Sequence, residues 1–258
     1  MILAEPAPSQ GDVHFRIFGI PVRVHPFFWV ISLLIGLQGD PLPVKVLLWV
    51  ASMVVSILIH ELGHALIQRH FGGRPRIVLH GMGGLAICGD CDRSTRSQIL
   101  ISLAGPGAGF ALALLIFVVV RAAGHQIGCL WSDKIPFEAL GLEAVNRLNL
   151  AGTTFYWEPF QSKNVDRMVG SLLQINILWG AVNLLPIYPL DGGQVARELC
   201  LLGNPRTGII LSLRISMIAA IAMVLVGLSS ESLYVAIMFG YFAYSSYKTL
   251  DAYRASLW

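Results

Sequence analysis

Long apolar runs separated by short polar segments dominate this chain. A helix needs about 20 apolar residues to cross a bilayer, and most of the runs approach or exceed that length, although the first is short. They predict six membrane spans, at about residues 26–37, 44–71, 98–120, 168–202, 209–228 and 233–247. We therefore expect an all-α polytopic membrane protein with about six transmembrane helices, whose membrane domain covers residues 26–248.

Two segments carry a strand pattern instead. Residues 14–24 partly alternate and are rich in β-branched and aromatic side chains, which favours a strand near the membrane surface within an N-terminal segment of residues 1–25. Residues 74–90 hold two apolar stretches around a glycine-rich turn at 81–84, which predicts a β-hairpin. We expect a small membrane-associated sheet here, and an apolar edge strand of this kind can pair with an extended peptide.

The one long loop covers residues 121–168. Apolar positions recur at helical spacing over 137–150, which favours an interfacial helix, with Trp131, Tyr156 and Trp157 as anchors at headgroup level. An ordinary packed loop helix explains the same pattern equally well.

Composition and charge agree with a membrane protein. Hydrophobic residues make up 55% of the 258 residues and charged residues only 13%, against about 25% charged in soluble domains. On a six-span topology, twelve of the 18 lysine and arginine residues fall on the side of the termini. The positive-inside rule then places the termini, including a tail of residues 249–258, in the cytoplasm. Basic runs with interleaved aromatic residues are absent from the sequence, so we expect no nucleic-acid partner. The N-terminus also lacks the pattern of a cleaved signal peptide.

The second apolar run contains His60-Glu61-Leu62-Gly63-His64. Two histidines four residues apart lie on one face of a helix, so both imidazoles can bind one metal ion, and Glu61 can act as a base on water. The alternative is that the two histidines only hydrogen-bond to neighbouring helices. The topology places this motif in the cytoplasmic half of its span.

The fourth run is interrupted between residues 183 and 193, which read Asn-Leu-Leu-Pro-Ile-Tyr-Pro-Leu-Asp-Gly-Gly. Two prolines and two glycines do not fit a regular helix, and non-helical backbone at membrane depth is tolerated only inside protein or beside a water-filled cavity. Asp191 is a candidate third metal ligand, because a metal would offset the cost of a buried carboxylate. It could instead cap the turn. Asn183 could hold a peptide carbonyl or its oxyanion, or simply hydrogen-bond between helices.

Four cysteines are present, and two of them form the single CxxC sequence Cys88-Gly-Asp-Cys91. A second metal site or a redox pair would need further ligands or context that the sequence does not offer. The simplest interpretation is a pair of free thiols in a turn.

The segment from His60 to Ala65, taken together with residues 183–193, resembles the site-2 protease family of intramembrane zinc metalloproteases. The resemblance extends over about 44–200 and includes Ala104-Gly-Pro106 and the glycine-rich hairpin; the catalytic core would cover about 44–202. Tyr188 stands where many members have a second proline, which is similar to the branch that processes sporulation factors.

This resemblance implies one Zn²⁺ per chain, bound by His60, His64 and Asp191, with Glu61 as the catalytic base and Asn183 as an assisting residue. It also implies regulated intramembrane proteolysis: hydrolysis of a peptide bond within or near the transmembrane segment of a single-span protein, in a prokaryotic inner membrane. The chain length suggests a core without an appended PDZ domain. The alternatives are a metal-ion transporter that uses the same cluster, and a silent membrane scaffold.

Overall fold

The computed structural model describes residues 5–37, 42–81, 83–131, 144–150, 152–205 and 207–255. The helices among them are α1 (Pro26–Leu37), α2 (Pro43–His70), α3 (Thr95–Ala122), α4 (Lys163–Asn183), α5 (Asp191–Gly203), α6 (Gly208–Ser229) and α7 (Leu233–Ala255). The strands are β1 (Val13–Ile17), β2 (Ile20–Val24), β3 (Arg76–His80), β4 (Gly83–Ile87), β5 (Ile127–Leu130), β6 (Asn146–Leu150) and β7 (Thr153–Trp157).

Each predicted apolar run is helical, and the fourth run is split into α4 and α5. Three of the described helices, α2, α3 and α6, are long and apolar enough to cross a membrane. Helix α1 is apolar but has only 12 residues. The membrane character of the fold is therefore clear, and the number of six crossings stays a prediction.

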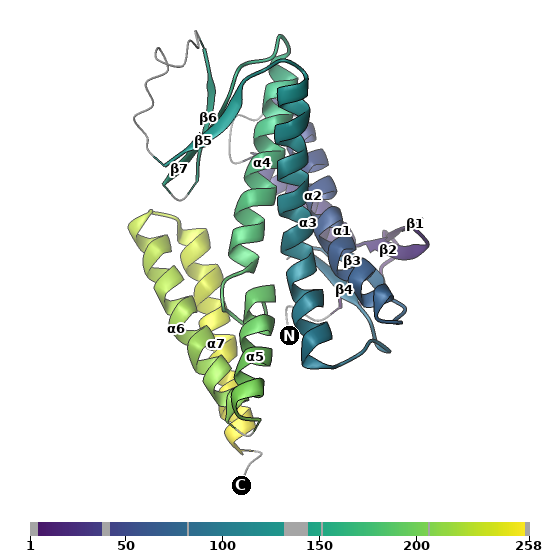
Figure 1. Ribbon diagram of the computed structural model, residues 1–258, viewed down its shortest axis with the longest axis vertical. Helices are drawn as coiled ribbons and strands as arrows, with labels where there is room; N and C mark the ends of the chain where they lie inside the picture. Colours follow the sequence, from purple (N-terminus) through teal and green to yellow (C-terminus); the bar gives the residue numbers. More distant parts are fainter. Residues whose placement is uncertain are drawn as a thin grey trace.

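Helices α2, α3 and α4 run side by side through the centre of the molecule, and α6 and α7 form a pair that packs mainly on α5 (Figure 1). Small residues allow the central helices to approach closely. A Cβ atom at Gly63 of α2 would overlap the Ala104 carbonyl of α3. In the α6–α7 layer the core is built from Ala220, Phe239 and Phe242, and it encloses Ile187 from the segment between α4 and α5.

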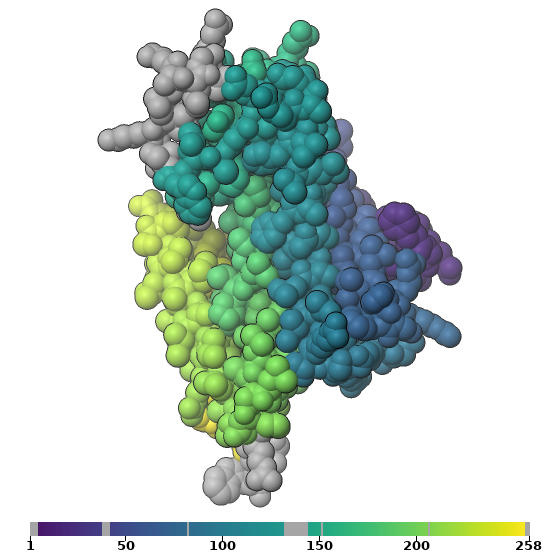
Figure 2. Space-filling model, in the orientation of Figure 1, coloured from purple at the N-terminus to yellow at the C-terminus, as the bar shows by residue number. Residues whose placement is uncertain are grey.

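Four strands form a sheet in the order β1-β2-β3-β4, on one flank of α2. The predicted hairpin at 74–90 is confirmed as β3 and β4, which pair antiparallel. The predicted strand at 14–24 is itself a hairpin, because Phe18 and Gly19 take positive φ and reverse the chain. Its second strand, β2, pairs in parallel with β3, and β4 is left at the edge next to α2. Figure 2 shows the N-terminal hairpin on the flank opposite α6 and α7.

A second sheet, in the order β5-β7-β6, lies in the long loop at the end of the molecule remote from the C-terminus (Figure 1). The predicted helix over 137–150 is wrong for residues 146–150, which form β6 and alternate between half-buried and exposed positions; residues 137–143 lie outside the described part. Trp157 is not a headgroup anchor, because its side chain is buried among α3 and α4 and donates to Asp166 Oδ1 at 3.3 Å.

The expectation of two free thiols at Cys88 and Cys91 is also wrong. The turn after β4 brings their Cα atoms to 5.7 Å, and the two residues form a disulfide. That separation lies within the usual range for a disulfide-bonded pair.

Candidate metal centre

Helix α2 supplies one half of the site. It begins with Pro43 in its first turn, where the missing N–H costs nothing, and continues unbroken to His70. His60, Glu61 and His64 are all buried on its inner side. One helical turn separates the two imidazoles, whose Nε2 atoms lie 3.2 Å apart.

The other half comes from the segment between α4 and α5. Helix α5 begins at Asp191, and the chain before it is held by the buried side chain of Ile187 and by the Tyr188 N–H, which donates to Ser216 Oγ at 2.8 Å. A proline at 188 could not make this bond. A Cβ atom at Gly193 would overlap the Ile187 backbone, so glycine is what lets α5 start this close to the preceding turn.

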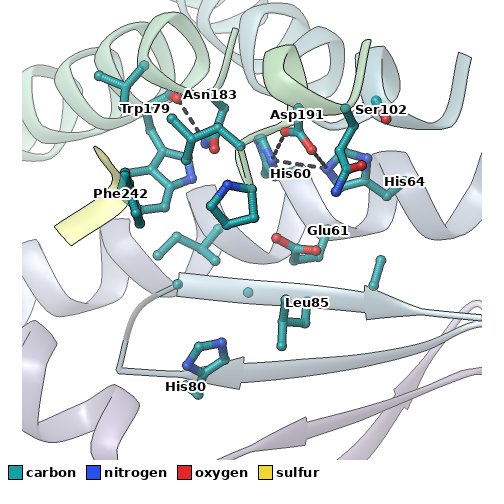
Figure 3. A pocket seen from close by; sticks show the side chains of 18 of the residues that line it. His60, Glu61, His64, His80, Leu85, Ser102, Trp179, Asn183, Asp191 and Phe242 are labelled. Atoms are coloured by element: carbon teal, nitrogen blue, oxygen red, sulfur yellow. Dashed lines mark hydrogen bonds and ion pairs between the residues drawn. The ribbon is translucent and has the colours of Figure 1, made fainter. Parts of the chain in front are cut away.

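The two halves meet at the Asp191 carboxylate (Figure 3). Its Oδ2 lies 3.2 Å from His60 Nε2 and its Oδ1 lies 3.3 Å from His64 Nε2. Ligand atoms of all three side chains fall within 4.8 Å of one another. The described hydrogen bonds of Asp191 thus run to the imidazoles and not to a helix terminus.

This donor set fits zinc. Tetrahedral zinc with bonds of about 2.0–2.1 Å to nitrogen and oxygen places its ligand atoms about 3.4 Å apart, close to the separations seen among His60, His64 and Asp191. Two histidines and one carboxylate are a usual ligand set for catalytic zinc, which leaves a fourth position for water or substrate. The cluster can therefore hold one zinc ion.

His64 is oriented by α3. Its Nδ1 lies 2.7 Å from the Ile101 carbonyl oxygen. A carbonyl can only accept, so this nitrogen carries the proton, and Nε2 presents a lone pair towards His60 and Asp191. Gly105 of α3 makes room for the ring, since a Cβ atom there would overlap His64 Nε2. Ile101 and Gly105 thus fix both the tautomer and the position of this ligand.

Glu61 lies over β4. A Cβ atom at Gly84 would overlap the Glu61 side chain, and the Ala86 N–H hydrogen-bonds to the Glu61 carboxyl. The carbonyl group of the same residue accepts from Gln68 Nε2 at 3.1 Å. Ala86 therefore directs both of its backbone groups at α2, and in an antiparallel ladder Gly84, two residues earlier, faces outward in the same way.

Asn183 is the last residue of α4 and is buried in the wall of the same cavity. Its Nδ2 donates to the Trp179 carbonyl at 3.0 Å, so one of its two N–H groups is engaged within α4. The structure thus brings Asn183 to the cavity, on the side of Trp179 in Figure 3, while His60, His64 and Asp191 contact one another directly.

The cavity around these residues has a volume of about 610 Å³ and is bounded by α1, α2, β3, β4, α3, α4, α5 and α7. His80 of β3 also lines it, and burial lowers the pKa of this imidazole, with a further lowering from nearby His25. A cavity of this size between helices and a strand edge can admit a peptide segment next to Glu61.

Sequence reasoning missed the residues that support the candidate ligands and the strand beside Glu61. Gln68 is four residues after His64 and so lies on the same face of α2, a spacing that offered a usable signal. The carbonyl of Ile101 offered no signal in the sequence, because every residue carries the same main-chain carbonyl group. Gly105 was noted only as part of the Ala104-Gly-Pro106 segment of the family resemblance.

Comparison with known proteins places both halves of the site in one family. Residues 48–229 match the family model of Peptidase family M50. A zinc metalloprotease of Methanocaldococcus jannaschii is 24% identical over 189 residues, which is 72% of this chain and 44% of that protein. Stage IV sporulation protein FB of Bacillus subtilis is 26% identical over 178 residues, 68% of this chain and 46% of that protein. The chain thus spans less than half the length of the curated relatives it matches.

The fold is also similar to a solved structure. The site-2 protease from Methanocaldococcus jannaschii superposes with a TM-score of 0.57, over 93% of this chain and 95% of that chain, at 19% sequence identity. At this identity the likeness shows a shared fold.

Proposed function

This chain belongs to peptidase family M50, and on that premise we propose that it is a zinc metalloprotease that hydrolyses a peptide bond of membrane proteins within or near the bilayer. The observation that carries the proposal is the meeting of His60, His64 and Asp191 beside the buried Glu61. Three apolar helices long enough to span a membrane agree with a site at membrane depth.

In this proposal His60, His64 and Asp191 hold one zinc ion. A bound zinc ion acts as a Lewis acid that polarises the scissile carbonyl and makes water more acidic. Glu61 accepts the proton of the attacking water and passes it to the leaving amine. The N–H of Asn183 that is not bonded to Trp179 donates to the substrate carbonyl oxygen.

We further propose that the substrate is a single-span membrane protein that unwinds locally and pairs with the edge of β4. A helical backbone hides its carbonyls, so an extended segment is required, and strand addition to a sheet edge provides it. Gly84 offers outward backbone groups next to Glu61, whereas the carbonyl of Ala86 is already bonded to Gln68. Regulated intramembrane proteolysis, six spans and cytoplasmic termini in an inner membrane belong to the same proposal.

The test uses purified protein, candidate single-span substrates and mass spectrometry of the products. We expect Glu61→Gln to lower cleavage by about 10²–10⁴-fold, the usual contribution of a general base, while bound zinc stays at one per chain. A chelator should stop cleavage by the unchanged protein. Full activity of Glu61→Gln, or cuts confined to regions far from the bilayer segment, would contradict the proposal.

Strand addition has its own test. In a β ladder only alternate residues of a strand direct their N–H groups at one partner. N-methylation of single peptide bonds around the cleavage site of a synthetic substrate should therefore slow cleavage at every second position. Equal sensitivity at all positions would contradict the proposed pairing with β4. It would not bear on the proposed role of the metal ion.

The second candidate function is metal-ion transport through the same cluster. Conduction needs several weak sites in sequence, and the described residues place one compact cluster of His and Asp at the centre of the helices. Zinc flux into liposomes, unchanged by Glu61→Gln and without peptide cleavage, would favour transport over proteolysis.

A further inference from the structure

The disulfide between Cys88 and Cys91 lies in the segment that leads from β4 to α3. Both cysteines are half-buried, and the two residues between them, Gly89 and Asp90, are exposed. A small reagent can therefore reach the sulfur atoms. The proposed hydrolysis makes no use of this pair.

The pair packs directly on the C-terminal end of α2. A Cβ atom at Gly73 would overlap both sulfur atoms. Cys91 Sγ lies 3.8 Å from the Gln68 carbonyl oxygen, which also accepts from the Gly73 N–H at 3.1 Å. The Arg74 N–H donates to Asp90 Oδ1 at 2.9 Å. Each side of the pair is thus in contact with the residues that follow α2.

The reduced form has a partner in place as well. Asp90 Oδ1 lies 3.4 Å from Cys88 Sγ, so this carboxylate accepts an S–H hydrogen bond when Cys88 is a thiol. We therefore expect the bond between Asp90 and Arg74 to persist in both states of the pair.

We propose that Cys88 and Cys91 form a reversible dithiol–disulfide couple that exchanges with low-molecular-weight thiols and disulfides. In the oxidising direction, the thiolate of one cysteine attacks a small disulfide and releases one small thiol. The second cysteine attacks the resulting mixed disulfide, forms the Sγ–Sγ bond and releases the second thiol. The two cysteines lose two electrons and two protons, and the small disulfide gains them as two thiols.

The cysteine pair lies close in the chain to the part of β4 that contacts Glu61. Cys88 is two residues after Ala86, whose backbone groups are bound by Glu61 and Gln68. The disulfide therefore closes the turn after β4 against Gly73, just beyond the end of α2, and we expect reduction to loosen this turn. The exchange reaction itself depends only on the cysteine pair and does not require the proposed proteolysis.

The direct test equilibrates the full-length protein in detergent with buffers of reduced and oxidised glutathione, then alkylates free thiols and maps them by mass spectrometry. We expect Cys88 and Cys91 to gain the label together as the buffer becomes more reducing, in one transition. Cys129, which is an exposed free cysteine, serves as the internal control, because a lone thiol is blocked only by gaining the mass of one glutathione, whereas the pair is blocked with no added mass. A constant state of Cys88 and Cys91 across the series would overturn the proposal.

A glycine pair tests the geometry. Gly73→Ala should favour the dithiol by about tenfold or more, because the added methyl group meets sulfur atoms that are locked in the disulfide but free to rotate as thiols. Gly89→Ala places its methyl group in open space and should leave the equilibrium unchanged. Equal equilibria for the two variants would overturn the inferred contact.

A third variant keeps the proposal testable if Gly73→Ala fails to fold. Cys91→Ser should leave Cys88 able to take up one glutathione under oxidising buffer, seen as a mass increase on the peptide that contains Cys88, which a reductant reverses. Because Cys88, Asp90 and Cys91 also lie close enough to hold a metal ion, protection from alkylation that a chelator removes would identify a metal site and overturn the redox couple.

Discussion

The two halves of the candidate metal centre are built in different ways. His60 and His64 belong to one unbroken helix, so their separation is set by four residues of regular backbone. Asp191 begins a short helix after a turn with two prolines, and nothing local fixes its distance from α2. Its position depends on Ile187, which is buried between α6 and α7, and on Ser216, which bonds to the Tyr188 N–H.

The contrast shows which parts of a site tolerate change. Ligands on one helix keep their spacing while that helix exists. A ligand on a broken segment keeps its place only while distant helices hold the segment. Substitutions far from the metal should therefore affect the Asp191 half more than the α2 half, except where α3 touches His64.

The largest effect should come from removing one ligand from each half. His64→Ala and Asp191→Ala should both reduce bound zinc and bring cleavage to background, because a catalytic zinc site needs three protein ligands. Metal analysis and product mass spectrometry measure the two effects. Retention of zinc and activity by Asp191→Ala alone would show that the broken segment does not complete the site.

The next effect concerns the contact of α3 with His64. Gly105→Ala should lower zinc affinity or activity by about 10–100-fold, the size expected when a group that supports a ligand is disturbed, because its methyl group overlaps the His64 ring. Gly107→Ala, two residues later on α3, places its methyl group in open space and is the matched control. Similar zinc titrations for both variants would rule out this steric account.

A smaller effect is expected at the start of α5. Gly193→Ala should destabilise the protein by about 1–3 kcal/mol, a usual cost of overpacking, because its methyl group overlaps the backbone of Ile187. Gly203→Ala, at the exposed end of the same helix, meets nothing within 4 Å and should change stability by less than about 0.5 kcal/mol. Thermal unfolding in detergent with zinc present compares the two variants. Unchanged stability of Gly193→Ala would show that the turn can move to accept the methyl group.

The smallest effect should follow from Ser216→Ala, which removes the acceptor of the half-buried Tyr188 N–H and the hydroxyl partner of Ser246. We expect a loss of about 1 kcal/mol in stability and weaker zinc binding, since Asp191 is three residues further on. Ser212→Ala is the control, because among the described residues Ser212 Oγ bonds to the Ile209 carbonyl of its own helix. If Ser212→Ala weakens zinc binding as much, the turn does not depend on Ser216.

Features that depend on a local sequence pattern could be predicted from the sequence. Apolar runs located the helices, the prolines of 183–193 located the break, and the i, i+4 histidines located one half of the site. Asp191 was reached by a different argument, the cost of a buried carboxylate, and the structure places it against both histidines.

What the sequence did not predict depends on partners far along the chain. The pairing of β2 with β3 joins residues about 55 positions apart, which no local pattern encodes. Residues 146–150 have apolar positions compatible with a helix, and only the neighbouring β7 selects the strand. The orienting bond from His64 to Ile101 uses a main-chain carbonyl, a group that every residue carries.

The parallel pairing of β2 with β3 also restricts the path of the chain. Val24 at the end of β2 lies opposite Leu79, and everything between these strands is α1, α2 and their connections. Both strands belong to one sheet, so the chain returns to the sheet that it left. If this sheet lies at one face of the bilayer, as we predict from the sequence, the number of crossings between the two strands must be even. A crossing by α2 would then require a second crossing by α1, although α1 has only 12 residues.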